Sequence, residues 1–503
     1  MSENLFDILE RGIADPQATA IETLSGERIA YADLVARTGR WANALTGLGV
    51  QPGDRVAVQV EKSVEAIILY LATARAGAVF LPLNTGYTPT EIDYFVGDAR
   101  PRVFVCDPAR AEVLAPVAEK AGAVLVTLGA DGKGTLADAA DAASPDFATV
   151  PRQADDLAAL LYTSGTTGRS KGAMLTHGNL VSNTRALQQA WRYSADDVLI
   201  HALPIFHTHG LFVATNVTLF SGASMIFLPK FDVDRIFELM GRATVLMGVP
   251  TFYVRLLQDD MLTAENTRHM RLFVSGSAPL LAETHREWQA RTGHAILERY
   301  GMTETNMNTS NPYDGDRIAG TVGMPLPGVE VIVTDPETGA ELPQGQIGMI
   351  EVRGPNVFKG YWQMPEKTAA ELRGNGFFIT GDLGKFDDRG YLHIVGRGKD
   401  LIITGGYNVY PKEIESEIDA LPGVVESAVI GLPHRDFGEG VTAVIVPTAR
   451  DATDEGKVLA ALDGRLAKFK QPKRVLFVDE LPRNTMGKVQ KNLLRDQFAD
   501  LYR

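Results

Sequence analysis

The chain has a single cysteine, no long apolar run and no excess of basic residues, and each scarcity excludes a class of protein. Cys106, alone among 503 residues, leaves no partner for an intrachain disulfide and no cysteine-built metal site. No uninterrupted apolar run reaches the roughly 18 to 20 residues that a membrane-spanning helix needs. The formal net charge of −13 argues against general nucleic-acid binding. An acidic start without a basic, apolar leader predicts a cytoplasmic protein.

Length and patterning predict an α/β protein of more than one domain. A chain of 503 residues exceeds what a single core usually organises. A strand-like stretch at 55–60 precedes an apolar helix at 63–76 and an apolar stretch at 78–83, which favours largely parallel strands. Short strands at 328–352, separated by Pro and Gly, predict a small β subdomain. Two glycines and three charges at 396–400 indicate an exposed hinge before a small α+β region.

A run of hydroxyl and glycine residues predicts a phosphate-binding loop. It follows the apolar stretch 157–161, so it begins where a strand is expected to end. Glycines allow close backbone approach to oxygens, hydroxyls can donate hydrogen bonds, and Lys171 adds a point charge. The Walker pattern places glycine directly before its lysine, whereas Ser170 stands there, so this is not a P-loop. The loop comprises Thr163, Ser164, Gly165, Thr166 and Thr167.

Four more motifs follow in a fixed order, at 300–304, 380–382, 396–400 and 484–488. With the phosphate loop they resemble the acyl-adenylate-forming superfamily of acyl-CoA synthetases, luciferases and peptide-synthetase adenylation domains. Ser170 departs from the proline common there. The resemblance spans nearly the whole chain and implies ATP and CoA as co-substrates. It also implies a large N-terminal domain of mixed sheets flanked by helices, a hinge and a small mobile C-terminal domain, which we place at 1–396, 397–400 and 401–503.

The segment around Glu304 is expected to meet the nucleotide. Glu304 follows a glycine turn and is a hard oxygen ligand, suited to Mg²⁺ shared with ATP phosphates. By resemblance, Thr303 contacts the α-phosphate, and the backbone near Arg299 and Tyr300 borders the adenine.

Two later motifs complete the expected nucleotide site. Asp382 lies between two glycines, where a carboxylate can accept both ribose hydroxyls, and the resemblance assigns it that role. The resemblance also implies that Arg397 contacts the nucleotide and that Lys399 lies close to the pivot of the C-terminal domain.

Lys488 is the expected mobile catalytic cation. Adenylation develops negative charge on the carboxylate and α-phosphate, and a delivered ammonium stabilises it. The resemblance implies that Lys488 swings in for adenylation and out for thioester formation. Acetylation of Lys488, by a partner acetyltransferase and reversed by a deacetylase, is a further hypothesis. After rotation, Gly405, Gly406 and Tyr407 would face the thiol. No carrier domain follows, so free CoA is the expected acceptor.

The acid pocket is expected to bind malonate. The resemblance places His207 beside the entering carboxylate, with Thr208, Ser277 and Met307 on the wall. Arg255 follows Val249-Pro250. Relatives that bind fatty or aryl acids usually need apolar side chains at this position. A buried charge left unpaired costs about 3–5 kcal/mol, enough to select a dicarboxylate. Arg286 is a second candidate. The segments around 207–210, 275–278 and 298–304 are similar to those of malonyl-CoA synthetases; methylmalonate is a second candidate acid, with Met307 limiting its α-substituent.

Three rival functions stay open. One is a CoA ligase for a medium-chain or aromatic monocarboxylic acid, and another is a stand-alone adenylation module that loads a carrier protein. A third is a catalytically silent binding protein on the same fold, against which the intact Lys488 and Glu304 argue. The leading prediction is a two-step ligase that forms malonyl-AMP and then malonyl-CoA, with small-molecule substrates and neither nucleic-acid nor membrane partners.

Overall fold

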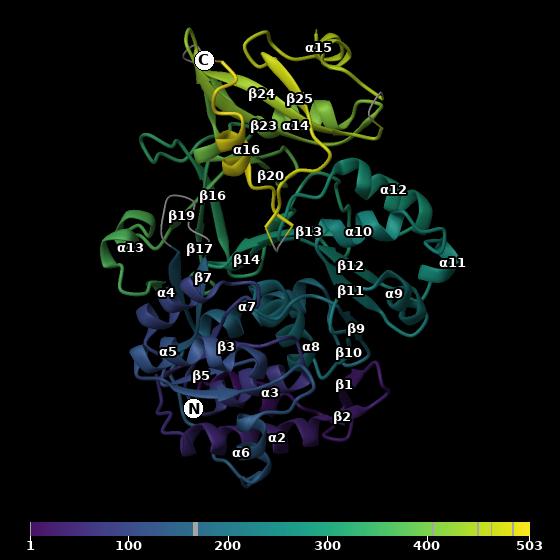
Figure 1. Ribbon diagram of the computed structural model, residues 1–503. Helices are drawn as coiled ribbons and strands as arrows, with labels where there is room; N and C mark the ends of the chain where they lie inside the picture. Colours follow the sequence, from purple (N-terminus) through teal and green to yellow (C-terminus); the bar gives the residue numbers. More distant parts are fainter. Residues whose placement is uncertain are drawn as a thin grey trace.

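Two large, mainly parallel sheets form the lower body of the molecule (Figure 1). The computed structural model describes residues 2–163, 170–404, 407–449, 452–463, 465–484 and 487–502. In the nine-stranded sheet the central strands are parallel, and antiparallel strands close both ends. In spatial order it comprises β15 (Met324–Pro325), β14 (Asn306–Ser310), β13 (Leu297–Met302), β12 (Leu272–Ser275), β11 (Val245–Gly248), β9 (Val198–His201), β10 (Ser224–Phe227), β1 (Thr19–Thr23) and β2 (Arg28–Ala30).

The seven-stranded sheet is also mainly parallel, with antiparallel strands at one end. Its parallel part ends at β7, where β8 turns back antiparallel. In spatial order it comprises β18 (Gly360–Tyr361), β8 (Lys171–Thr176), β7 (Leu157–Thr163), β4 (Val79–Pro82), β3 (Arg55–Gln59), β5 (Val103–Cys106) and β6 (Val124–Thr127).

Helices cover the faces of both sheets (Figure 1). Helix α3 is buried along nearly its whole length, and the Ser63 hydroxyl caps it by accepting from the Ala66 amide. The largest apolar cluster combines α3 with strands of both sheets. The helices of this body are α1 (Leu5–Arg11), α2 (Tyr31–Gly47), α3 (Val64–Arg75), α4 (Pro89–Ala99), α5 (Ala111–Ala121), α6 (Thr135–Asp141), α7 (His177–Ala190), α8 (Asn216–Phe220), α9 (Val233–Met240), α10 (Pro250–Leu257), α11 (Ala264–Thr267), α12 (Ala282–Thr292) and α13 (Pro365–Glu371), with a short 3₁₀ turn at Pro108–Arg110.

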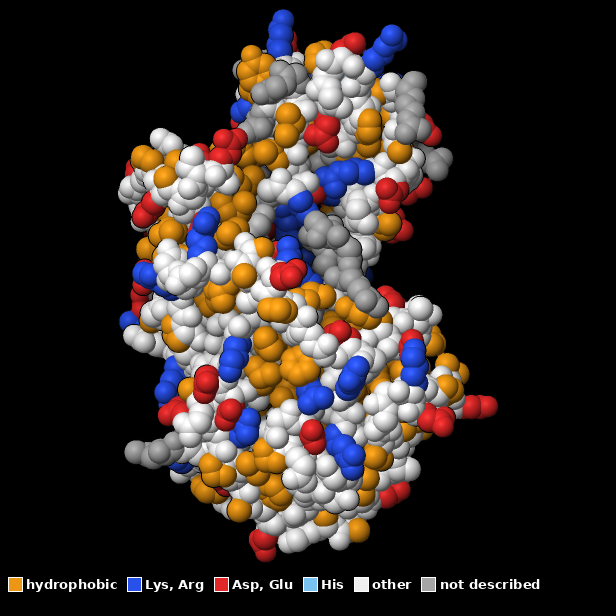
Figure 2. Space-filling model, turned by 90° about the vertical axis from the view of Figure 1, so that its left-hand side faces the viewer, with side chains coloured by type: hydrophobic (Ala, Val, Ile, Leu, Met, Phe, Trp, Pro, Cys, Tyr) orange, Lys and Arg blue, Asp and Glu red, His pale blue; other side chains and the backbone are white. Residues whose placement is uncertain are grey.

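Two smaller sheets complete the fold. An antiparallel sheet contains β16 (Glu330–Thr334), β17 (Gly348–Arg353), β19 (Phe378–Phe386) and β20 (Leu392–Arg397). A 3₁₀ turn, Gly398–Asp400, leads to the C-terminal part, which has apolar clusters of its own. The molecule narrows where this part meets the body, and Lys and Arg side chains gather there (Figure 2). The C-terminal part contains β21 (Ile402–Thr404), β22 (Tyr407–Val409), α14 (Pro411–Asp419), β23 (Val424–His434), β24 (Gly438–Pro447), α15 (Glu455–Leu462), β25 (Arg474–Phe477) and α16 (Lys491–Gln497).

The predicted fold class is confirmed, including the small β sheet that follows the large mixed sheets. Cys106 lies buried at the end of β5, and burial raises the pKa of its thiol to about 11. Within the described ranges, no helix combines the length and the apolar character needed to cross a bilayer.

Candidate active site

Loops that follow parallel strands of the nine-stranded sheet meet at one edge of it. The segment 202–208 follows β9, Gly276 and Ser277 follow β12, and Arg299 lies within β13. Ligands of open α/β sheets bind beyond the carboxyl ends of the parallel strands. The chain then forms a π-helix at His209–Thr215, a rare form that occurs often at functional sites. This edge is therefore the first candidate for a ligand site.

Buried polar atoms without hydrogen-bond partners concentrate at this edge. His209 Nδ1 lies 3.2 Å from Ser277 Oγ, so the loops after β9 and β12 are in contact. Nearly all buried polar groups in proteins are paired, so a cluster of unpaired ones indicates space for a polar ligand. Among the described residues, the unpaired atoms here are Arg299 Nε and Nη2, His207 Nε2, Thr208 Oγ1, His209 Nε2 and Ser275 Oγ.

Arg299 provides the buried positive charge of this cluster. The residue is 4% exposed, and burial lowers the pKa of its guanidinium to about 9, so the group is still charged at neutral pH. Gly276 makes room for it, because a Cβ at Gly276 would lie 2.4 Å from Arg299 Cζ. Leaving a buried charge unpaired costs about 3–5 kcal/mol, so an anion beside Arg299 would be strongly stabilised.

The two arginines predicted for the acid pocket are not buried. Helix α10 buries Tyr253 and Leu256, which leaves Arg255 exposed with its guanidinium 6.0 Å from the centre of the Phe231 ring. Arg286 is likewise exposed, because α12 turns other side chains inward. The expectation that Arg255 or Arg286 supplies a buried charge is therefore wrong. Sequence reasoning placed Arg299 only beside the adenine, and the signal it missed is that Arg299 follows Glu298 within a single strand, β13.

The other residues expected in the acid pocket lie at the same edge. His207 has a buried, unpaired Nε2, and desolvation with a smaller contribution from Lys488 lowers the pKa of the ring to about 3. Thr208 and Met307 are buried. The Met307 Cε lies 2.6 Å from where a Cβ on Gly301 would be, so Met307 is packed against the turn after Tyr300. Ser277 adopts a left-handed conformation with φ of 73°.

A second group of polar side chains lies beside the first. Asp382 on β19 faces Arg397 on β20, with the Arg397 Nε 3.0 Å from Asp382 Oδ1. The Tyr300 hydroxyl donates to the other Asp382 oxygen at 2.6 Å. Two donors therefore hold this buried carboxylate in one orientation, ready to accept further hydrogen bonds. Thr303, partly buried, lies in the turn between β13 and β14.

Glu304 is a buried carboxylate next to a charged network. The Tyr361 hydroxyl lies 3.1 Å from Glu304 Oε1, and burial raises the pKa of Glu304. Lys171 Nζ lies 3.4 Å from Glu371 Oε2. No group of three or more His, Cys, Asp or Glu side chains suited to a metal occurs in the described part of the chain. Glu304 could therefore hold Mg²⁺ only together with oxygens of a bound ligand, which is the usual arrangement for this ion.

Lys488 reaches this site from the C-terminal part. A Cβ on Gly487 would lie 3.7 Å from the Thr251 side chain on α10, so the loop touches the body. The Lys488 amide donates to Asn484 Oδ1 at 3.0 Å. Solvent still reaches the side chain, but the surrounding protein lowers the pKa of Lys488 by desolvation, and Arg397 adds to this shift. Lys488 therefore lies within electrostatic range of His207, Asp382, Glu304, Arg299 and Arg397.

Several predicted residues lie elsewhere or outside the described residues. Ser164, Gly165, Thr166 and Thr167 are outside them, as are Gly405 and Gly406. Thr163 ends β7, and its hydroxyl lies 3.5 Å from the Lys171 carbonyl. Tyr407 is 58% exposed and stacks on Phe469, and Lys399 is exposed in the 3₁₀ turn. Tyr407 and Lys399 are thus solvent-exposed in the arrangement seen here.

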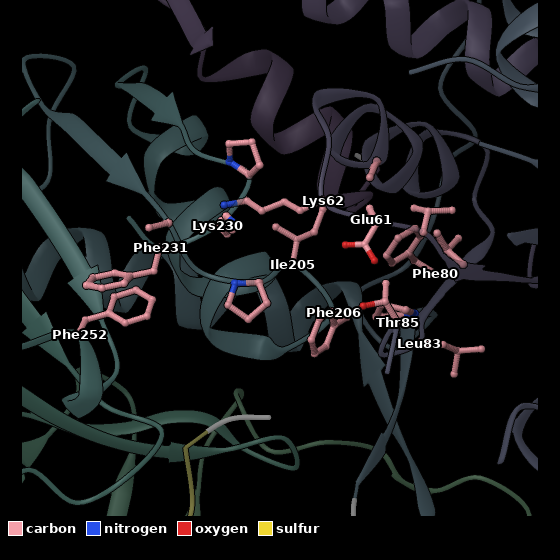
Figure 3. Close-up of a pocket in the computed structure, with 17 residues that line it drawn as sticks. Glu61, Lys62, Phe80, Leu83, Thr85, Ile205, Phe206, Lys230, Phe231 and Phe252 are labelled. Carbon is pink, nitrogen blue, oxygen red and sulfur yellow. The ribbon is translucent and has the colours of Figure 1, made fainter. Parts of the chain in front are cut away.

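An apolar cavity of about 220 Å³ opens beside this site (Figure 3). It lies beyond the carboxyl ends of β3, β4, β9 and β10. Phe206 lines it and contacts the His207 ring, with 4.6 Å between ring centres, so the cavity is one side chain away from His207. Lys62, which no motif predicted, runs along the cavity and donates to the His201 carbonyl at 2.8 Å. Phe252, Phe231 and Thr85 also line the cavity.

Comparison with known proteins identifies the family. Residues 10–362 match the family described as AMP-binding enzyme, and residues 413–488 match its C-terminal domain. ATP-bound MatB from Rhodopseudomonas palustris is 69% identical over 100% of both chains, with a TM-score of 0.99; the apo form of the same protein gives 0.88. A feruloyl-CoA synthase from Amycolatopsis is 38% identical, covering 98% of both chains. A malonate–CoA ligase from Arabidopsis thaliana is 36% identical, covering 92% of this chain and 81% of its own.

These matches cover both parts of the molecule. The candidate site residues described above lie where the two parts meet. The chain therefore belongs to the AMP-binding enzyme family and, within it, to the acyl-CoA synthetases, which are AMP-forming acid–thiol ligases.

Proposed function

We propose that this chain is an ATP-dependent malonate–CoA ligase that forms malonyl-CoA, AMP and pyrophosphate through malonyl-AMP. The observation that carries the proposal is the buried, unpaired guanidinium of Arg299 at the end of the acid pocket. A monocarboxylate would leave that charge without a partner, whereas the distal carboxylate of malonate would pair with it. The 36% identity to a malonate–CoA ligase supports the same assignment.

In the first step, the proximal carboxylate of malonate attacks the α-phosphorus of ATP, and pyrophosphate leaves. Lys488 would stabilise the negative charge that develops between the carboxylate and the α-phosphate. His207 carries no positive charge at neutral pH, because its pKa is about 3, so its unpaired Nε2 would orient the acid by hydrogen bonding. Thr303 would contact the α-phosphate, and Lys171 would bind the outer phosphates.

The nucleotide would be held by the second polar group. Asp382, fixed by Arg397 and Tyr300, would accept the ribose hydroxyls. Mg²⁺ held by Glu304 and phosphate oxygens would supply charge neutralisation for the leaving pyrophosphate.

In the second step, the CoA thiol displaces AMP from the acyl carbonyl. We propose that the C-terminal part, residues 401–503, first rotates about 397–400, which withdraws Lys488 and presents the segment around Tyr407. The apolar cavity beside Phe206 suits the pantetheine arm of CoA, since it lies one side chain from His207 and is lined mainly by apolar groups (Figure 3). The TM-scores of 0.99 and 0.88 to ATP-bound and apo MatB support an arrangement here that suits the first step.

A second candidate is a CoA ligase for an aromatic acid. The 38% identity to a feruloyl-CoA synthase over nearly the whole chain favours it. The polar pocket wall and the charge of Arg299 argue against an aromatic tail. Both readings share the adenylation chemistry and the expected cytoplasmic location, and they differ only in the acid.

The test is a comparison of acids. Purified protein with ATP, Mg²⁺ and CoA receives malonate, methylmalonate, octanoate or ferulate separately, and AMP and thioester are measured. We expect malonyl-CoA, with slower turnover of methylmalonate because Met307 limits the α-substituent. Turnover of ferulate or octanoate instead would overturn the malonate assignment. ATP–pyrophosphate exchange with malonate but no thioester would favour a carrier-loading module.

A further inference from the structure

Glu371, at the end of α13, is the anion that binds Lys171 in this structure. Lys171 Nζ lies 3.4 and 3.5 Å from the two Glu371 oxygens, and 4.2 Å from the centre of the Tyr361 ring. Glu371 has two closer partners: Lys367 Nζ at 2.7 Å and the Tyr361 hydroxyl at 2.6 Å. The contact with Lys171 is therefore the loosest of the three.

Lys171 can leave this network without leaving the Glu371 carboxylate unpaired. When Lys171 moves away, Lys367 and Tyr361 still neutralise and hydrogen-bond Glu371. Burial raises the pKa of Glu371, but Lys367, Tyr361 and Lys171 together lower it, so the carboxylate is ionised at neutral pH. Tyr361 also approaches Glu304 at 3.1 Å, which places the network next to the carboxylate proposed for Mg²⁺. Lys171 thus has a resting partner that competes with any phosphate for the same ammonium.

We propose that Glu371 is a positioning residue that competes with phosphate oxygens for Lys171 and so promotes the release of pyrophosphate after adenylation. The proposal rests on the proposed function, since it assumes that Lys171 binds the outer phosphates of ATP. Pyrophosphate would have to hold Lys171 against the fixed, ionised carboxylate of Glu371, so Glu371 weakens the binding of this product. In this proposal Glu371 acts through Lys171 and contacts neither the substrate nor the reacting atoms.

The proposed competition predicts that two substitutions change the inhibition constant for pyrophosphate and the KM for ATP in opposite directions. Glu371→Gln removes the competing charge, so the inhibition constant for pyrophosphate and the KM for ATP should both fall, by about three- to five-fold, as expected for a partly exposed ion pair. Lys367→Met removes the rival cation, so Glu371 holds Lys171 more tightly and both constants should rise. Lys367 is 41% exposed, and its loss leaves no buried cavity. Glu371→Asp, which keeps the charge, should restore constants close to those of the parent.

The experiment measures ATP–pyrophosphate exchange, pyrophosphate inhibition and calorimetric pyrophosphate binding on the full chain. Glu366→Gln is the matched control, because it makes the same change at an exposed position on the same helix. A purely structural role for Glu371 would raise both constants in Glu371→Gln, and that result, or no change, would overturn the proposal. Absence of exchange in the parent protein with every acid would instead overturn the proposed function.

Discussion

At the residue scale, the acid specificity proposed for the pocket depends on which arginine is buried. Arg299 has two unpaired guanidinium nitrogens and sits against Gly276, where any larger residue would collide with it. Arg255 lies on the outer side of α10 and rests over Phe231. Only Arg299 is placed to neutralise a second carboxylate that becomes buried in the pocket.

Replacement of Arg299 should therefore separate malonate from other acids. We expect Arg299→Leu to lower kcat/KM for malonate at least about 100-fold, because the distal carboxylate loses a partner worth about 3 kcal/mol. Arg299→Lys should be intermediate, since an ammonium lacks the bidentate geometry. Arg255→Leu is the matched control and should keep parental kinetics. A collapse in Arg255→Leu with an active Arg299→Leu would reverse the assignment.

The residues that gather at the site were predictable as motifs, but the burial of each was not. Motif order placed Asp382, Arg397 and Lys488 on the nucleotide side, and the structure brings these three together. Choosing between Arg255 and Arg299 required the helical phase of α10, which follows from Tyr253 and Leu256 packing inward. Tertiary contacts decide which face of α10 points inward, and the local sequence does not show those contacts.

At the element scale, α14 carries an acid whose environment opposes ionisation. Asp419 ends this helix, accepts from the Ser427 hydroxyl at 2.7 Å and has a side chain that is 9% exposed. Desolvation is the largest cause that raises its pKa to about 6, against the smaller lowering effects of Lys412 and Ser427. Folding therefore raises the proton affinity of Asp419 above that in the unfolded chain.

The stability contributed by Asp419 should depend on pH with a definite sign. Because its folded pKa exceeds the unfolded one, the contribution is full below about pH 4, declines as pH rises to about 6 and is lost above it. Asp419→Asn should thus raise stability at pH 8 by about 2 kcal/mol relative to the parent, and much less at pH 4. Asp496→Asn, an exposed change on α16, is the control. Thermal unfolding at both pH values is the measurement; an equal effect at both would contradict it.

Regular elements were easier to predict than irregular ones. The expected helix at 63–76 is observed at Val64–Arg75, because its apolar period and Ser63 cap are local signals. The π-helix at His209–Thr215 had no such signal. Its path depends on Gly210, where a Cβ would lie 2.0 Å from the Pro204 carbonyl oxygen, so close backbone packing within the segment after β9 requires glycine there.

At the scale of the whole molecule, two parts with separate cores meet near Lys488, the proposed catalytic lysine. The C-terminal part contacts Thr251 of the body at Gly487 and is joined to the body by the turn Gly398–Asp400. Asp400 pairs with Arg495 of α16 at 2.7 Å, so the turn is tied to the C-terminal side. A rotation that separates the two reactions would have to change dihedral angles near Lys399.

Restricting that turn should block one reaction and spare the other. Lys399→Pro fixes φ near −65° and restricts Gly398, so we expect near-parental ATP–pyrophosphate exchange and thioester formation reduced at least about 100-fold. Lys399→Ala should support both reactions, which separates backbone restriction from loss of the charge. Parallel assays of exchange and thioester check this, and equal loss of both would argue against rotation about 397–400.

Cys106 has a practical consequence for following such a rotation. The chain has one sulfhydryl, buried on β5 with a pKa raised to about 11, so it reacts poorly with alkylating labels. Two cysteines introduced on the surface, one on the body and one on the C-terminal part, would be the reactive pair for spectroscopic probes, and Cys106 would not have to be replaced. An enzyme proposed to use a free thiol as substrate would thus offer no exposed cysteine with which that substrate could form a mixed disulfide.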